Sequence, residues 1–263
     1  MIGGGVMGEA LISRLIMKSI YQPIEVLVSE PNYDRRNFLH AQYGVQVTPE
    51  NTQVTQASDV ILLAIKPQIF PQVATELQGA LQTSTAVLVS ILAGTSIAQL
   101  EAAFPNQPIL RAMPNTPAQV GAGITAIARG QQAQAYHVER AQQVLATVGS
   151  VIEVPEALMD AVTGLSGSGP GYVALVIEAL ADGGVVAGLP RPIALQLAIQ
   201  TVLGTAQLLQ ESGLHPGELK DRVTSPGGTT IAGIAQLEKQ GLRSALIEAV
   251  RAAANRSKEL GDR

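Results

Sequence analysis

The sequence predicts an α/β protein: a Rossmann-type parallel-sheet cofactor domain followed by an all-helical dimerisation domain. Three observations support this fold class. A glycine-rich motif opens the chain, and short apolar strands then alternate with amphipathic helices, as in a parallel sheet covered by helices. From Ala157 onward the alternation stops and helical patterns follow one another. We place the boundary near Val154 and Pro155, which gives predicted domains 1–155 and 156–263.

Five short apolar runs predict the strands of the first domain. Residues 59–65 form a nearly continuous apolar run, which is typical of a strand buried on both faces. Helical patterns lie between most of these runs. We expect strands at residues 24–29, 59–65, 86–91, 108–113 and 123–128, and helices at 9–19, 33–43, 70–80 and 97–103.

The second domain is predicted to be helical throughout. Pro190 suits the first turn of a helix, and Gly188 is a suitable terminator for the helix before it. Few charges occur between Tyr172 and Leu209, so we expect more apolar surface than a small monomer covers, and infer a helix-mediated homodimer. The expected helices are residues 157–165, 169–187, 190–212, 216–224, 229–240 and 242–260.

Composition excludes several classes of function. The net charge is −4 with no basic run, which argues against nucleic acid as a partner. The absence of cysteine excludes disulfides, thiolate metal sites and a cysteine nucleophile, and the three histidines show no metal-ligand spacing. We find no signal peptide and interpret no apolar run as long enough to span a membrane. A cytoplasmic protein without a metal or a membrane partner is expected.

Residues 3–8 match the G-x-G-x-x-G pattern, in which Gly3, Gly5 and Gly8 let the backbone approach a pyrophosphate at a helix N-terminus. An amphipathic helix and a strand follow, as this interpretation requires. Only Met1 and Ile2 precede the motif, so we expect the first strand to be largely missing because an N-terminal segment is missing. We expect added upstream apolar residues to stabilise the fold.

The end of the second strand carries groups that can select the cofactor. Glu30 stands where a carboxylate can bind the ribose hydroxyls of NAD, whereas Arg35 and Arg36 can bind the 2′-phosphate of NADP. From these residues, both NAD and NADP remain possible cofactors.

Two further loops follow strands at the edge where open parallel sheets bind ligands. Lys66 and Pro67 follow the strand at residues 59–65, and Lys66 is expected to point toward the cofactor. A proline-stiffened loop follows the strand at residues 108–113. Its Asn115 can both donate and accept hydrogen bonds, as recognition of a carboxamide requires.

The most informative segment is Ser225-Pro226-Gly227-Gly228-Thr229-Thr230. A rigid turn is followed by two glycines, two hydroxyls and the start of a helical pattern. Free backbone N–H groups and the positive end of a helix dipole suit a small carboxylate.

Together these motifs resemble the pyrroline-5-carboxylate reductase family, and the resemblance covers nearly the whole chain. The last motif is the most specific, because several unrelated Rossmann families would not contain it. The motifs are GGGVMG at residues 3–8, IKPQ at 65–68, RAMPNTP at 111–117, GLSGSGP at 164–170 and HPGELKDRVTSPGGTT at 215–230.

The resemblance implies an NAD(P)H-dependent oxidoreductase that reduces 1-pyrroline-5-carboxylate to L-proline, the last step of proline biosynthesis. It implies a homodimer, often assembled into a decamer, with NADPH as the cofactor and NADH possible. By motif, Thr230 would hydrogen-bond the ring nitrogen of the substrate. Ser225 and the backbone N–H groups of Gly228, Thr229 and Thr230 would hold its carboxylate. The implied cofactor site comprises Gly5, Val6, Met7, Asn51, Ala64, Lys66 and Pro67, with Met113 and Asn115 near the nicotinamide.

Two alternatives remain at this point. One is another Rossmann-type dehydrogenase acting on hydroxy acids. Such enzymes usually carry a catalytic lysine early in the second domain, and no lysine occurs between Ala157 and Thr205. The other is a non-catalytic NAD(P)-binding module.

Overall fold

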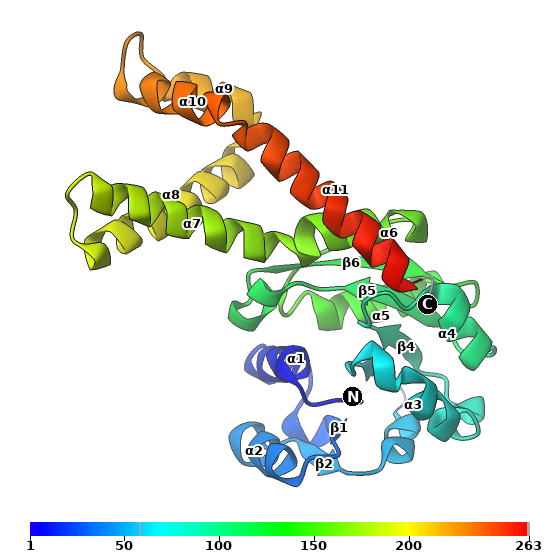
Figure 1. The fold of residues 1–263 in the computed structure, drawn as a ribbon. Coiled ribbons are helices and arrows are strands. Elements are labelled where there is room, and N and C mark those ends of the chain that lie inside the picture. Colours follow the sequence, from blue (N-terminus) through cyan, green and yellow to red (C-terminus); the bar gives the residue numbers. More distant parts are fainter. Residues whose placement is uncertain (58, 262–263) are drawn as a thin grey trace. The chain divides into compact units, whose positions relative to one another are not determined.

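The computed structural model describes residues 1–57 and 59–261, which form two compact units. The first unit comprises Met1–Ser168 together with the chain from Ala252, and the second is Gly169–Arg251. Figure 1 shows strands and helices alternating through the first unit. Its strands are β1 (Leu27–Ser29), β2 (Gln46–Thr48), β3 (Val60–Leu63), β4 (Val87–Ser90), β5 (Ile109–Met113), β6 (Gly123–Arg129) and β7 (Gly149–Glu153). Its main helices are α1 (Val6–Met17), α2 (Tyr33–Tyr43), α3 (Phe70–Leu77), α4 (Ile97–Ala103), α5 (Ala135–Leu145) and α6 (Met159–Val162).

The first three residues lie between β1 and β3. Ile2 forms parallel bridges to Ser29 of β1 and to Leu63 of β3. β1 pairs with β2, and β3 to β7 are hydrogen-bonded in chain order. Ile2 therefore connects the two groups of strands through a single bridge on each side, at the place of a central strand. This bridge also fixes the glycine-rich loop, because Gly3 N–H donates to the Ser29 carbonyl at 2.8 Å.

The sheet is parallel except at one pairing, and β6 and β7 run opposite to the other strands. β6 runs antiparallel to β5, which corrects the expectation of a purely parallel sheet. The connection from Met113 to Gly123 holds only the 3₁₀ turn Thr116–Val120, and is too short for the crossover that parallel neighbours need. The prediction also missed β2, β7 and α5. β6 and β7 are parallel, with α5 as their crossover.

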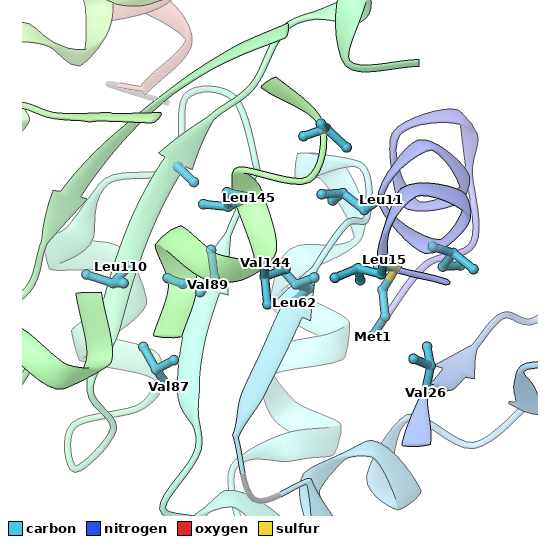
Figure 2. Close-up of a cluster of buried hydrophobic side chains, with 14 of the residues drawn as sticks. Met1, Leu11, Leu15, Val26, Leu62, Val87, Val89, Leu110, Val144 and Leu145 are labelled. Atoms are coloured by element: carbon cyan, nitrogen blue, oxygen red, sulfur yellow. The ribbon is translucent and has the colours of Figure 1, made fainter. Parts of the chain in front are cut away.

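Alternate residues of the central strands pack against helices on opposite faces. On β3, Leu62 belongs to the apolar cluster that includes Leu11 of α1 and Val144 of α5, whereas Leu63 belongs to the cluster around α3 and α4. Figure 2 shows Leu62 and Val144 beside Leu15. This period of two places both faces of the sheet in the core. The carboxyl ends of the strands remain as the edge that carries the candidate site.

A cavity of about 480 Å³ adjoins Met1 at the amino ends of β1 and β3. The Met1 amino group donates to the Leu27 carbonyl at 2.6 Å, and burial lowers its pKa to about 5. Figure 2 shows the neighbouring Met1, Leu15 and Leu62 side chains. Other residues that line the cavity include Val26, Leu27, Val60 and Val144.

The second unit is helical, as predicted (Figure 1). It contains α7 (Gly169–Val186), α8 (Arg191–Ser212), α9 (Pro216–Arg222) and α10 (Thr229–Lys239), and α11 (Leu242–Gly261) begins in it. Gly213 ends α8 in the left-handed conformation, and the His215 side chain caps α9 by accepting from Gly217 N–H. α7 and α8 pack against each other through a small cluster that includes Ala181, Ala194 and Ala198.

Most of the apolar surface of α7 and α8 is exposed. By length and composition, the helical stretches 156–186 and 191–212 could each cross a membrane, which corrects the interpretation that no apolar run reaches that length. Only 6% and 11% of their most apolar windows are buried, so these are not core helices in the isolated chain. Prominent exposed residues are Leu175, Leu180, Leu197, Ile199, Leu203 and Leu208.

Candidate functional site

The three glycines of the G-x-G-x-x-G motif have different structural roles. Gly3 has φ +97°, and a Cβ there would lie 2.4 Å from the carbonyl oxygen of Ala64. A Cβ on Gly8 would lie 2.5 Å from the carbonyl oxygen of Gly3, whereas a Cβ on Gly5 would meet nothing within 4 Å. Gly3 therefore makes the tight turn, Gly8 allows α1 to approach the loop, and Gly5 leaves open space in front of the backbone.

This open space lies at the start of α1, where Gly5 is the N-cap residue. The first N–H groups of a helix have no intrahelical partner, and the helix dipole makes this end positive. Val6 is 66% exposed at this end, and Met7 packs against the core behind it. A cradle of backbone with no Cβ in front of it fits the pyrophosphate of a dinucleotide.

The three residues predicted to select the cofactor, Glu30, Arg35 and Arg36, all form hydrogen bonds within the protein. Both carboxylate oxygens of Glu30 accept backbone N–H groups, from Gly4 and from Asn32, at 3.0 Å each. Arg35 hydrogen-bonds the glycine loop and Glu9, and Arg36 donates to the carbonyl oxygens of Glu30 and Pro31. Glu30 thus lies beside the loop, as a ribose ligand must.

The segments after β2 and β3 carry further predicted residues of the cofactor site. Asn51 accepts from the Ser29 hydroxyl at 2.7 Å and donates to Glu76 at 2.6 Å, which fixes its side chain. Ala64 continues β3 beside Gly3, and its N–H donates to the Ile2 carbonyl. Lys66 is exposed, and its amino group bonds to no residue that the structure describes. Pro67 begins a 3₁₀ turn directly after it.

The loop after β5 carries Met113 and Asn115. The Asn115 side chain donates to the Ser166 carbonyl at 3.2 Å and accepts from Ile124 N–H at 3.0 Å. It thereby ties the loop to the π-helical turn Thr163–Gly167. The Met113 methyl lies against Gly167, where an added Cβ would be 2.8 Å from it. Both ends of the Asn115 amide are engaged, and its contact with a carboxamide remains a prediction.

The Ser225–Thr230 segment forms a turn at the N-terminus of α10. Gly227 has φ +68°, and Gly228 N–H donates to the Ser225 carbonyl at 3.1 Å. Gly228 is the N-cap of α10, so the N–H groups of Thr229 and Thr230 begin the helix. A Cβ on Gly228 would lie 2.4 Å from the Ser225 hydroxyl, which explains the glycine. Neither threonine hydroxyl is bonded to any residue that the structure describes, so both are available to a ligand.

Sequence reasoning missed two side chains beside the glycine loop. Glu9 lies in the first turn of α1, and the hydroxyl of Tyr43 at the end of α2 donates to it at 2.8 Å. A carboxylate directly after the third glycine was a visible signal for Glu9. Tyr43 carried none, because its partner lies 34 residues away.

Two family models match parts of the chain. Residues 156–260 match the family model described as pyrroline-5-carboxylate reductase dimerisation. Residues 1–94 match the model described as NADP oxidoreductase, coenzyme F420-dependent. The first match covers most of the second predicted domain, and the second covers the glycine loop and the edge around Asn51 and Lys66.

Full-length relatives were also found. The chain is 56% identical over 260 residues to the pyrroline-5-carboxylate reductase of Synechocystis sp., covering 99% of this chain and 97% of the relative. A solved pyrroline-5-carboxylate reductase from Coxiella burnetii is similar with a TM-score of 0.92 and 36% identity, over 98% of this chain and 96% of the other. The Plasmodium falciparum enzyme, solved with NADP bound, is similar with a TM-score of 0.88 and 30% identity, over 99% and 96%.

Proposed function

The chain belongs to the pyrroline-5-carboxylate reductase family, and we propose that it reduces 1-pyrroline-5-carboxylate to L-proline with NADPH, or with NADH, as the cofactor. The observation that carries the proposal is the turn before α10. It offers helix N-terminal N–H groups and the unbonded Thr230 hydroxyl, which suit a substrate that has both a carboxylate and a ring nitrogen. The glycine cradle supplies the complementary place for a nicotinamide dinucleotide.

The reaction needs little from the protein beyond positioning. A protonated cyclic imine is electrophilic at its ring carbon, and the bound reduced nicotinamide supplies the hydride. The chain's own residues orient the two rings and balance the substrate charge, which requires no strong base. We propose that the cofactor is held by Gly3, Gly5, Gly8, Asn51, Lys66 and Pro67. Met113 and Asn115 would lie toward its nicotinamide.

The same turn supports a proposal for the substrate contacts. We propose that the Ser225 hydroxyl and the backbone N–H groups of Thr229 and Thr230 bind the carboxylate. The Gly228 N–H, which the resemblance adds to this set, already donates to the Ser225 carbonyl within the turn. The Thr230 hydroxyl would hydrogen-bond the ring nitrogen. Because a threonine hydroxyl is a weak acid at neutral pH, its role is to orient the nitrogen and at most to relay a proton.

A direct assay tests the function. The purified chain is mixed with pyrroline-5-carboxylate and either NADPH or NADH, and the absorbance of the reduced nicotinamide is followed. We expect turnover of pyrroline-5-carboxylate, and the two kcat/KM values measured in parallel decide which cofactor is preferred. Turnover of a hydroxy acid with NAD⁺ instead would favour the dehydrogenase alternative, and binding without turnover would favour a non-catalytic module.

The family model for dimerisation matches residues 156–260, which include α7 and α8. A second copy of the chain would cover the exposed apolar surface of these two helices. We propose a homodimer through these helices, with assembly into a decamer as the higher state and the cytoplasm as its location. A lipid partner for the same surface would require detergent for solubility. Sedimentation velocity without detergent separates monomer, dimer and decamer.

We expect Leu203→Glu to shift the sedimenting mass toward the monomer. Leu203 is 49% exposed on α8, and a buried unpaired carboxylate in an apolar interface is strongly unfavourable. Ile24→Glu is the matched control, because Ile24 is 69% exposed and belongs to the first unit, not to α7 or α8. An unchanged mass for Leu203→Glu would argue against α8 as the interface.

A further inference from the structure

The Arg35 side chain joins the glycine-rich loop to helix α1. Its Nε donates to the carbonyl oxygen of Gly4 at 2.6 Å, and one terminal nitrogen lies 3.5 Å from the carbonyl oxygen of Gly5. The same terminal nitrogen lies 2.5 Å from a carboxylate oxygen of Glu9. Because a guanidinium is a planar fork with fixed donor directions, it holds these three acceptors in one arrangement.

The partners of Arg35 are themselves fixed. The other oxygen of Glu9 accepts the Tyr43 hydroxyl at 2.8 Å, and the guanidinium lies 5.1 Å from the Phe38 ring centroid. Burial acts to raise the pKa of Glu9, but the hydrogen bonds from Arg35 and Tyr43 outweigh it and the pKa is lowered. Glu9 is therefore a carboxylate at neutral pH. Arg35 and Tyr43 of α2 thus both bond Glu9 of α1 beside the loop (Figure 1 shows both helices).

The loop needs such support because Gly3, Gly4 and Gly5 have no side chains to pack. Glycine has more backbone freedom than any other residue, and that freedom is lost when the loop is ordered. A loop that is ordered before the ligand arrives binds more tightly, because less entropy is lost on binding. Arg35 is the side chain that engages two successive loop carbonyls, Gly4 and Gly5.

Arg36 provides a contrast within the same turn of α2. It donates to the carbonyl oxygens of Glu30 and Pro31 and lies over the Tyr33 ring. None of these acceptors belongs to residues 3–8. The two arginines differ in position by one residue but support different segments.

We propose that Arg35 is a positioning residue which, together with Glu9 and Tyr43, holds the glycine loop in the form that binds a dinucleotide, and that it is not a ligand of a 2′-phosphate. The proposal rests on the proposed function insofar as it takes the loop's ligand to be a nicotinamide dinucleotide. It changes the role that the sequence suggested for Arg35, and gives Glu9 and Tyr43 a role.

Binding measurements with two cofactors separate the two roles. For Arg35→Met we expect the dissociation constants of NADPH and NADH, measured by calorimetry, to rise by the same factor of about 10. If Arg35 were a ligand of the 2′-phosphate, Arg35→Met would weaken the binding of NADPH but not of NADH, and that result would overturn the proposal. Unchanged binding of both cofactors would also overturn it. Arg36→Met is the matched control, and we expect it to leave NADH binding unchanged.

Glu9→Gln tests the same distinction by the sign of its effect. If Arg35 clamps the loop, loss of the carboxylate weakens NADPH and NADH alike. If Arg35 instead binds the 2′-phosphate, Glu9 competes with the phosphate for the guanidinium. Glu9→Gln would then tighten NADPH binding, and this result would overturn the proposal. Tyr43→Phe removes one hydrogen bond to Glu9 and is expected to weaken both cofactors less than Glu9→Gln does.

Hydrogen exchange on the cofactor-free protein makes the test independent of the proposed function. We expect the backbone amides of residues 4–8 to exchange about 10-fold faster in Arg35→Met than in the unaltered chain or in Arg36→Met. Unchanged exchange would overturn the clamp. If the unaltered chain bound neither dinucleotide, the proposed function would fail, and exchange alone would decide whether Arg35 holds the loop.

Discussion

Thr230→Ala is expected to lower kcat/KM for pyrroline-5-carboxylate about 10–1000-fold, the scale of a lost positioning or general-acid contact. The Thr230 hydroxyl stands at the second position of α10 and has no partner among the residues that the structure describes. Removal of this hydroxyl therefore leaves no unpaired group in the protein. The contact that is lost is the proposed hydrogen bond to the substrate. The dissociation constant of NADPH is expected to change little, since the cofactor contacts proposed here lie in other segments.

Steady-state kinetics measure this effect, and the chain offers a matched control. Thr229 is the preceding threonine of the same turn, and the proposal uses its backbone N–H but not its hydroxyl. We expect Thr229→Ala to retain kcat/KM within about threefold, and Thr230→Ser to recover most of the loss seen in Thr230→Ala. Kinetics of Thr230→Ala equal to those of the unaltered chain would remove Thr230 from the mechanism.

Local patterns predicted most helices well. The sequence placed α2 and α4 at their observed bounds, because Asn32 and Ser96 cap their N-termini and Gly44 ends α2. It missed β2, β7 and the reversed direction of β6. These short strands are defined by their pairing partners, and β2 exists only through its ladder with β1. Pairing between distant segments is not encoded in local periodicity.

The candidate site also has parts that the sequence predicts and parts that it does not. The glycine motif and the turn before α10 are each a continuous stretch of sequence, so their residues could be identified directly from it. The Arg35–Glu9 pair spans 26 residues, and only the packing of α2 against α1 brings it together. The position of Arg35 after the second strand suggested a possible 2′-phosphate ligand, because a free arginine and a bonded arginine look alike in a sequence. Asn115 likewise gave no sign that both ends of its amide are engaged.

Gly5→Ala is expected to separate cofactor binding from folding. Gly5 has φ −68° and ψ −169°, which alanine adopts without strain, and the added methyl meets nothing within 4 Å. Alanine is a poorer N-cap than glycine, but it also reduces the entropy of the unfolded chain, and the two effects oppose each other. The melting temperature of the cofactor-free protein should therefore change by no more than about 2 °C.

The same methyl is expected to weaken NADPH and NADH binding about 10- to 100-fold, because the second glycine of this motif allows the backbone to approach the pyrophosphate. Gly3→Ala is the opposing control: its φ of +97° and the 2.4 Å approach to the Ala64 carbonyl predict a melting temperature lower by roughly 5 °C or more. Calorimetric titration and thermal melting of both variants measure the two effects. Dinucleotide binding by Gly5→Ala at the affinity of the unaltered chain would mean that the pyrophosphate does not lie against this loop, and the cofactor site would have to be sought elsewhere on the sheet edge.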